Sequence, residues 1–310
     1  MSGGSTDQYE PPITSTMARQ QNEIDSLRLL VAQRSLYAKA KRWMGGRWIG
    51  MSVIAIAAPI FALLLPATAT AGGAIAALWA FFGRTTLSQK EKKASEKGAA
   101  VQELFDFSVY AMPSSGRRTS APSLEDIHII AGDDSEVRRR ADKERLLDWY
   151  PFDVNQLGRI SVAICQRANV TYTDRLLRST ANMWISIMTI WFIMLATMSV
   201  LLNLEFTTVL LGIILPLLPA FLDIYEYWRS IKKAARDRRE LSYAIEEKLD
   251  NNAADLDNQD LLVWQNELFN LRRVAPQVPD FIYWIKRRKN EMAMNNSAQQ
   301  ISNNINRNEE

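Results

Sequence analysis

Two long apolar runs joined by a short turn place the strongest constraint on how this chain folds. Residues 183–222 contain one acidic or basic side chain, Glu205, which separates the apolar runs 183–202 and 206–222. A helix needs about 20 apolar residues to cross the hydrocarbon of a bilayer. Both runs are apolar on every face, whereas a surface helix of a soluble protein keeps a polar stripe. Residues 183–228 are therefore predicted to form a transmembrane hairpin, in preference to a buried hairpin of a soluble protein.

An earlier apolar block, residues 48–82, predicts a first transmembrane hairpin. Pro66 and the pair Gly72-Gly73 divide it into two segments, and the block is too long for one crossing. A single tilted helix is the alternative interpretation. The sequence is thus typical of an all-α integral membrane protein with two transmembrane helical hairpins.

The distribution of basic residues predicts the orientation of these hairpins. Lys and Arg crowd into residues 34–47, 84–97 and 229–239, whereas the short connections near residues 66–73 and Glu205 contain none. Because Lys and Arg remain on the cytoplasmic side of a membrane, we expect four crossings with both termini in the cytoplasm.

The polar segments are predicted to form a helical cytosolic domain from the middle insert and the C-terminal tail. Helices are expected over residues 87–110 and 135–149 and from Arg159 into the membrane, where no helix breaker interrupts the stalk up to Met183. The expected divisions are disordered residues 1–16, a cytosolic helix at 17–47, the first hairpin at 48–82, the insert and stalk at 83–182, the second hairpin at 183–228, a helical tail at 229–294 with a break at 251–258, and disordered residues 295–310.

Composition argues against several classes of function. The chain has one histidine, His128, and one cysteine, Cys165. A single cysteine excludes a disulfide within the chain, and a single histidine argues against His-based metal sites and Ser-His-Asp catalysis. We therefore expect no enzyme activity, no catalytic residue and no resident metal or cofactor. A DNA partner is not expected either.

Several charged and aromatic residues are candidates for a site, each with a structural alternative. Glu103 and Asp106 lie one helical turn apart, and structural ion pairs are favoured for them over a metal or acid–base role. Arg167, Asp174 and Arg178 recur at spacings of seven and four, so they share a helix face. An ion network that includes Asp174 and a phosphate site are equally compatible with this arginine face. The candidate ligand-binding residues are Arg167, Arg175, Arg178, Gln166, Trp149 and Tyr150, where the aromatic pair suits either nucleobase stacking or core packing.

Arg138, Arg139 and Arg140 form a run of like charge next to these motifs. Such a run is interpreted as a solvated helix face or as a contact with anionic lipid.

Four motifs resemble one known family. AAVQELFD, LLDWYP and CQRANVTYTDRLLR, together with the N-terminal QQNEIDSLRLLVAQRSLYAKAKR, are similar to the SMODS-associated four-transmembrane family of proposed pore-forming effectors. The resemblance extends from Gln20 to about Lys289. Two positions depart from the family pattern: Ser114 stands where a tryptophan follows Pro113, and Tyr172 is the one aromatic residue left before Asp174.

The resemblance implies a bacterial anti-phage effector in the cell inner membrane. A neighbouring nucleotidyltransferase would make a cyclic oligonucleotide, which would bind the cytosolic domain and activate the membrane part. Permeabilisation of the inner membrane would then cause abortive infection. A membrane-anchored scaffold without pore activity, which recruits a partner through the tail, is the alternative.

A pore would require several copies, because four helices are too few to enclose a wide aqueous channel. The second hairpin is the expected lining, since the motif-bearing stalk leads into it. The pore-lining candidates are Glu205, Thr197, Ser199 and Thr207. A ring of Glu205 carboxylates would favour cations, although a simple boundary role is the favoured interpretation. Pro216 and Pro219 are predicted to let the second helix bend.

Overall fold

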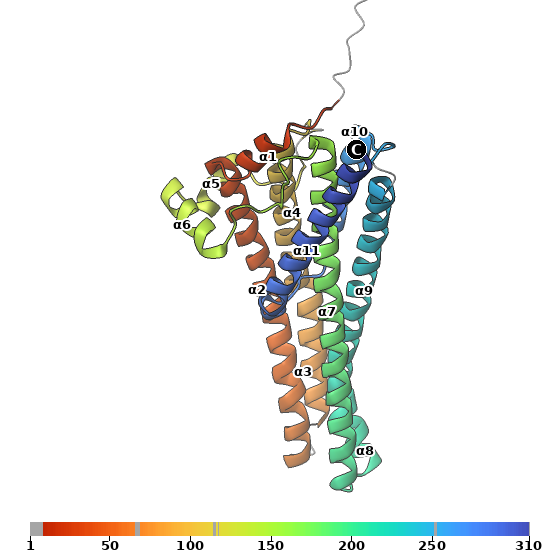
Figure 1. The fold of residues 1–310 in the computed structure, drawn as a ribbon. Coiled ribbons are helices and arrows are strands. Elements are labelled where there is room, and N and C mark those ends of the chain that lie inside the picture. Colours follow the sequence, from red (N-terminus) through yellow and green to blue (C-terminus); the bar gives the residue numbers. More distant parts are fainter. Residues whose placement is uncertain (1–8, 66–68, 114–115, 117, 251–252, 310) are drawn as a thin grey trace, which may run out of the picture.

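The described chain is built around four long helical rods that lie side by side (Figure 1). The computed structural model describes residues 9–65, 69–113, 116, 118–250 and 253–309, and in this part of the chain helices are present and strands are absent. The rods pair as two antiparallel hairpins. The first is α2 (Ile24–Leu64) against α3 (Ala69–Phe82) and α4 (Ser88–Tyr110), and the second is α7 (Gly158–Leu201) against α9 (Leu215–Asp250). The predicted all-helical fold is confirmed.

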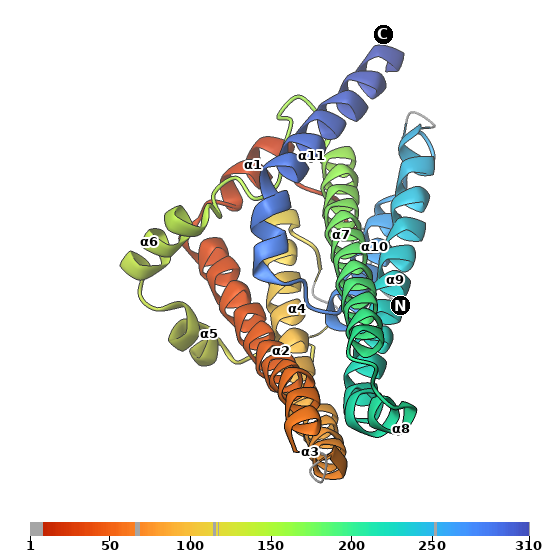
Figure 2. The same cartoon turned by 90° about the horizontal axis from the view of Figure 1, so that it is seen from below.

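Shorter elements surround the upper ends of the rods (Figures 1 and 2). These are α1 (Thr14–Gln20), α5 (Leu124–Ala131), α6 (Asp134–Glu144), α10 (Asn258–Arg273) and α11 (Asp280–Glu309). Single π-helical segments, η2 (Gly83–Leu87) and η3 (Val209–Ile214), interrupt the rods near the ends of α3 and α9, and α8 (Phe206–Thr208) lies at the lower turn.

The rods are continuous because the sequence offers no strong breaker at the predicted boundaries. Gly45 and Gly46 lie inside α2, where a glycine costs only about 1 kcal/mol relative to alanine. Consequently α2 joins the predicted helix at 17–47 to the predicted span, and α7 joins the motif-bearing stalk to the next span. We call residues 48–82 and 183–222 the apolar bundle and the rest of the described chain the polar domain.

The apolar bundle exposes most of its large apolar side chains among the described residues. Among the described residues, α7 is the one helix that is long and apolar enough to cross a membrane by itself, and none of its apolar 18-residue window is buried. The pair Phe206–Ile214 and Leu217–Asp250 is bent by 55° and counts as a second span if it crosses as one. A core helix of a soluble protein would bury such a window. Two candidate spans do not establish the four predicted crossings, so the two-hairpin topology remains a prediction.

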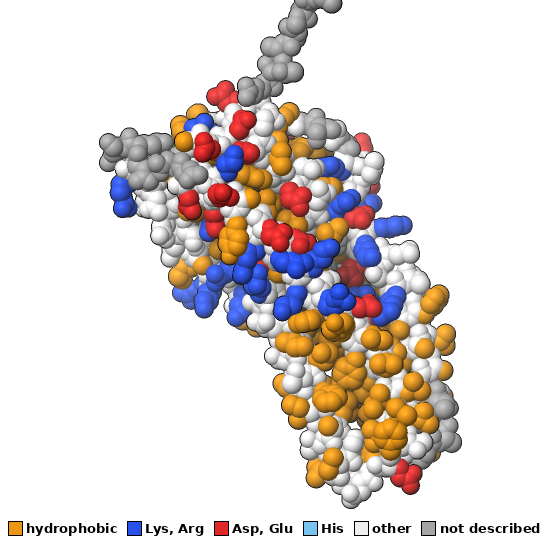
Figure 3. Space-filling model, turned by 90° about the vertical axis from the view of Figure 1, so that its right-hand side faces the viewer, with side chains coloured by type: hydrophobic (Ala, Val, Ile, Leu, Met, Phe, Trp, Pro, Cys, Tyr) orange, Lys and Arg blue, Asp and Glu red, His pale blue; other side chains and the backbone are white. Residues whose placement is uncertain are grey.

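The surface changes character abruptly where the apolar bundle meets the polar domain. Figure 3 shows apolar side chains over the lower half and a belt of Lys and Arg directly above it. A small core fills this neck: Met44, Leu177 and Tyr227 are buried there, and the Trp48 and Trp184 rings stack with centroids 4.6 Å apart. Aromatic rings and basic side chains of this kind favour a membrane interface.

The predicted disorder at both ends is wrong for the described residues. Near the N-terminus, Tyr9 donates a hydrogen bond to the carbonyl of Tyr110, and Thr14 donates to that of Gln156. Near the C-terminus, α11 continues to Glu309 because Ala298 and Ile305 are buried in the core of the polar domain. Residues 1–8 and 310 lie outside the described residues.

The middle insert also differs from its predicted helices. The helix expected over residues 135–149 ends at Glu144, where Arg145 takes a left-handed conformation with φ 53°. A further helix of the insert, α5, was not predicted from the sequence. Pro66, Ser114 and residues 251–252 of the predicted break lie outside the described residues.

Gly50 permits a close approach between α2 and α3. A Cβ atom at this position would overlap the indole ring of Trp79, whose Nε1 is held by a 3.2 Å hydrogen bond to the carbonyl of Arg47. We expect Gly50→Ala to destabilise the first hairpin by about 1–3 kcal/mol, seen as a lower melting temperature of the detergent-solubilised protein. Gly46→Ala is the matched control, because nothing lies within 4 Å of its added Cβ. An equal effect of both variants would contradict the close approach.

Candidate functional site

The predicted arginine face of α7 contacts neighbouring helices. Arg167 Nε donates to Glu246 Oε1 on α9 at 2.7 Å, and Arg175 Nε donates to Asn290 Oδ1 on α11 at 3.0 Å. Arg178 Nε lies 2.8 and 2.9 Å from the two carboxylate oxygens of Asp174. Each of the three guanidinium groups therefore already has a protein partner in this structure.

The other predicted ligand residues lie in or against the core of the polar domain. Gln166 is buried and donates to the carbonyl of Leu261 and to Gln265 Oε1 at 3.0 and 3.1 Å. The hydroxyl of Tyr150 is also buried, and the ring of Trp149 packs against the same core. Tyr150 therefore offers no open face for a nucleobase in this conformation, whereas Trp149 is only partly buried.

Asp106 is the centre of a buried polar network. Its side chain has no solvent exposure and accepts hydrogen bonds from Tyr150 at 2.6 Å, Gln265 at 2.7 Å and Arg272 at 2.5 Å. Burial and the Asp106 charge raise the pKa of Tyr150 well above its ordinary value, so this phenol remains a donor. Burial lowers the pKa of Arg272, but the nearby Asp106 carboxylate raises it by more than burial lowers it. The pKa of Arg272 therefore lies above its ordinary value. The network links α4, α10 and the segment before α7.

The remaining predicted acidic residues also pair with arginines. Arg118 donates two 2.9 Å hydrogen bonds to Glu103, and Arg239 lies 3.7 Å from Asp174. The arginines that pair with Glu103 and Asp106 thus lie in the loop before α5 and on α10, and not on α7. Within the described part of the chain, no group of three or more His, Cys, Asp or Glu residues is placed to hold a metal ion.

The predicted pore-lining residues lie on the lower part of the second hairpin. Glu205, Thr197 and Thr207 are exposed in this single chain. Ser199 is half-buried, and its hydroxyl donates to the carbonyl of Leu195 in the same helix at 2.9 Å.

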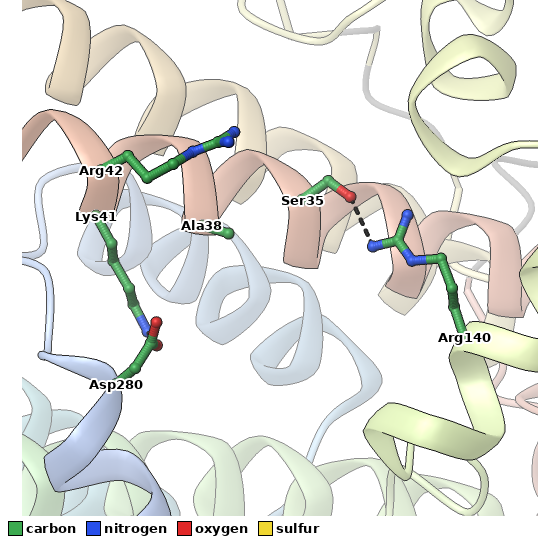
Figure 4. A pocket seen from close by; sticks show the side chains of 6 residues that line it. All are labelled: Ser35, Ala38, Lys41, Arg42, Arg140 and Asp280. Atoms are coloured by element: carbon green, nitrogen blue, oxygen red, sulfur yellow. Dashed lines mark hydrogen bonds and ion pairs between the residues drawn. The ribbon is translucent and has the colours of Figure 1, made fainter.

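A basic cleft that the sequence analysis did not identify opens between α2, α6 and the start of α11 (Figure 4). Its volume is about 480 Å³, and it is lined by Ser35, Ala38, Lys41, Arg42, Arg140 and Asp280. Three of the six lining residues are cationic and one is anionic. The cleft therefore carries a net positive charge, which suits an anionic ligand.

The cations of the cleft differ in how firmly they are held. Lys41 Nζ lies 2.5 Å from Asp280, and Arg140 Nη2 donates to the hydroxyl of Ser35 at 2.8 Å (Figure 4). Arg140 Nη2 also lies 3.4 Å from Glu144 Oε1 on the same helix. Arg42 is exposed and forms no hydrogen bond or ion pair with any residue that the structure describes. Its guanidinium is thus free to bind an oxyanion through a planar pair of N–H groups.

An aromatic ring lies beside the cleft. The guanidinium of Arg34 stacks over the Tyr283 ring at 4.8 Å, and the Lys41 ammonium lies 5.9 Å from the same ring. Tyr172, the aromatic residue that remains before Asp174, contacts Tyr283 from α7 with centroids 6.5 Å apart. The cleft is therefore connected to the motif-bearing stalk through two tyrosines.

A second cavity is polar but contains no cation. It has a volume of about 520 Å³ between the segment that precedes α7 and the middle of α11, and its lining includes Asp153, Gln156, Ser161, Asn295, Gln299 and Asn303. Without Lys or Arg in its lining, this cavity is less suited to phosphate than the basic cleft.

Comparison with known proteins agrees with the motifs. A family model described as the SMODS-associating 4TM effector domain matches residues 15–301. A probable CBASS effector molecule from Bacillus cereus (strain VD146) is 22% identical over 287 residues, which cover 90% of this chain and 95% of that protein. No solved structure matches the chain significantly. The match spans the apolar bundle and the polar domain together, so the chain is a membrane protein that belongs to the SMODS-associating 4TM effector domain family.

Proposed function

We propose that the protein is a membrane effector of a bacterial anti-phage system. A cyclic oligonucleotide from a neighbouring nucleotidyltransferase activates it, and the activated protein oligomerises to permeabilise the inner membrane and cause abortive infection. The observation that carries the proposal is the direct helical connection between a basic cleft and an exposed apolar bundle, in a chain whose family consists of effectors.

The basic cleft is the proposed ligand site in place of the α7 arginines. A cyclic oligonucleotide presents at least two phosphates, and Arg42 and Arg140 approach the cleft from different helices. Charge-assisted hydrogen bonds to phosphate are stronger than those between neutral groups. Arg42 pairs with no carboxylate of the described residues, whereas Arg167 and Arg178 would each have to leave one before they could bind a phosphate.

The cleft is suited to transmit binding because four of its six lining residues belong to α2, a helix that continues into the apolar bundle. Ser35, Lys41 and Arg42 lie on α2, which continues without interruption to Leu64 in the first hairpin. A ligand that draws α6 and α11 towards α2 would change the position of that rod. The second hairpin would respond through α7, which packs on α11 through Tyr172 and Arg175.

The membrane topology belongs to the same proposal. Four crossings would place both termini, the insert and the tail in the cytoplasm, where a cytosolic second messenger can reach the cleft. Copies of the chain would associate through the exposed apolar faces of α7 and α9, and Glu205 would lie at the outer turn.

Charge reversal in the cleft tests the ligand site. We expect Arg42→Glu to weaken binding of the cyclic oligonucleotide by roughly 10- to 100-fold, because a hydrogen bond to a charged group contributes about 1.5–3 kcal/mol. The measurement is a titration of purified full-length protein with a panel of cyclic di- and trinucleotides. Lys39→Glu is the matched control, since Lys39 is exposed on the same helix outside the cleft.

Two further results discriminate between the alternatives. If Arg42→Glu bound the cyclic oligonucleotide as tightly as the wild type and Arg167→Lys did not bind it, the ligand site would lie on α7. Binding without ligand-dependent dye uptake in expressing cells would favour the scaffold.

A further inference from the structure

The first turns of α11 begin at the neck, next to the apolar bundle. Val278, two residues before this helix, packs against the buried neck cluster that contains Met44 and Tyr227. Tyr227 of that cluster donates to the carbonyl of Gln277, and Lys41 pairs with Asp280 at the helix start. These contacts fix the start of α11 at the level where the basic belt meets the apolar surface (Figures 1 and 3).

This end of α11 has an outward face of large apolar side chains. Phe281, Trp284 and Ile285 are 54%, 55% and 72% exposed, and their spacing of three and four places them on one side of the helix. The opposite side is packed, because Ile282 and Asn290 are buried. The exposed residues are therefore not needed to hold α11 on the polar domain.

Exposed cations accompany the apolar face: Arg288 lies on the same side of the helix and Lys289 at its edge, whereas Lys286 lies on the flank towards Ile282. Lys286, Arg288 and Lys289 are exposed, and none of them forms an ion pair with a residue that the structure describes. An amphipathic helix that combines Phe, Trp or Ile with Lys and Arg is typical of a segment that lies in a membrane interface. The attraction of such basic segments to a negative leaflet adds to the apolar contact.

We propose that the first turns of α11 rest on the cytoplasmic leaflet and bind anionic lipid. Phe281, Trp284 and Ile285 enter the headgroup region, and Lys286, Arg288 and Lys289 contact lipid phosphates. Continuity with the exposed apolar bundle favours lipid as the occupant. A second copy of the chain would bring the same three cations against each other, which is unfavourable at short range. The inference requires insertion of the bundle in a bilayer and does not depend on the ligand or on pore formation.

The contact gives α11 a role at the cleft. Asp280 lines the cleft and Tyr283 lies beside it, while Phe281 and Trp284 face outwards from the same turns. Anionic lipid would therefore hold one wall of the cleft at a fixed height above the membrane.

A fluorescent label on α11 tests the lipid contact. The chain has one cysteine, Cys165, which is buried, and burial raises the pKa of its thiol well above the ordinary value. Replacing it in Cys165→Ala removes the one native thiol that could compete for the label. Ile285→Cys carries the environment-sensitive fluorophore NBD, and the full-length protein is placed in vesicles of phosphatidylcholine and phosphatidylglycerol. We expect brominated lipids to quench the label strongly, and more strongly as the phosphatidylglycerol fraction rises.

Ile129→Cys is the matched control, because Ile129 is 81% exposed but lies on α5, away from the apolar bundle (Figure 1). Its label should remain unquenched. Absence of quenching at residue 285 overturns the proposal, whether the label faces water or a second copy. Phe281→Cys repeats the measurement on the same face if the labelled Ile285 variant does not fold.

Replacement of the three cations by glutamine tests the headgroup contact. In Lys286→Gln, Arg288→Gln, Lys289→Gln protein we expect quenching in phosphatidylglycerol vesicles to fall to the level in phosphatidylcholine alone. Unchanged dependence on phosphatidylglycerol would overturn the anionic part of the proposal. Neither result bears on ligand affinity, so failure here is distinguishable from failure of the proposed function.

Discussion

Replacing Asp106 with alanine is expected to destabilise the folded protein by about 3–5 kcal/mol, because Arg272 would keep its charge in a buried site without a counter-ion. Asp106 has no solvent exposure and Arg272 has 6%. The Nε and Nη2 atoms of Arg272 have no hydrogen-bond partner among the described residues, so Asp106 provides its main compensation. Tyr150 and Gln265 would also lose their shared acceptor. The measurement is thermal or denaturant unfolding in detergent, followed by the fluorescence of the polar domain.

A double replacement separates the charge from the packing. Asp106→Leu combined with Arg272→Met removes both charges, and we expect it to recover most of the lost stability. Glu103→Ala is the second comparison: its partner Arg118 is partly exposed and can be solvated, so the loss should be smaller. If Asp106→Ala and the double replacement lowered the free energy of unfolding equally, packing around Asp106 would matter more than its charge.

A proline in the stalk should separate ligand binding from action on the membrane. Asn182 is exposed on α7 at the top of the apolar run, just after the buried neck residue Ala181. Asn182→Pro removes a main-chain hydrogen bond and places its ring against the preceding turn, which costs about 3 kcal/mol or more in a helix interior. We expect the basic cleft to retain its affinity for cyclic oligonucleotides, whereas dye uptake by expressing cells should be lost.

Asn182→Ala provides the control for the loss of the side chain. It preserves the helix and should leave both properties unchanged. Full dye uptake in the proline variant would contradict transmission through a continuous α7, and lost ligand affinity would show that the bend also distorts the polar domain.

The long helices could be predicted from the sequence because apolar runs and the lack of breakers act locally. The apolar residues before Glu205 and the breaker-free stalk before Met183 determine α7, and the structure shows one helix there. A bend was predicted near Pro216 and Pro219, and the two parts of the second candidate span lie at 55° to each other. The Asn-rich end was mispredicted because its few apolar residues, such as Ala298 and Ile305, stabilise α11 only through packing on the rest of the chain.

The basic cleft could not be predicted because its cations come from distant parts of the chain. Lys41 and Arg42 belong to a basic run that the sequence explains by membrane topology, and Arg140 belongs to a run that resembles a solvated helix face. Only the packing of α6 and α11 on α2 brings them together. In the same way, the partners of Arg167 and Arg175 lie on α9 and α11, at sequence separations that no local pattern reveals. The pair of Arg178 with Asp174 is different, because their spacing of four places both on one face of α7.

Because α2 and α7 pass through the neck without a break, they limit where the polar domain of one family member can be joined to the apolar bundle of another. A flexible linker would let a polar domain be joined to another bundle at many positions. A continuous helix instead fixes the rotation of the bundle about the helix axis relative to the polar domain. Each residue inserted in α2 or α7 would rotate everything below it by about 100°, since a helix has about 3.6 residues per turn. The stacked Trp48 and Trp184 rings, which lie on different rods, tolerate no such rotation of one rod alone. Functional chimaeras should therefore be restricted to junctions that change both rods by whole turns.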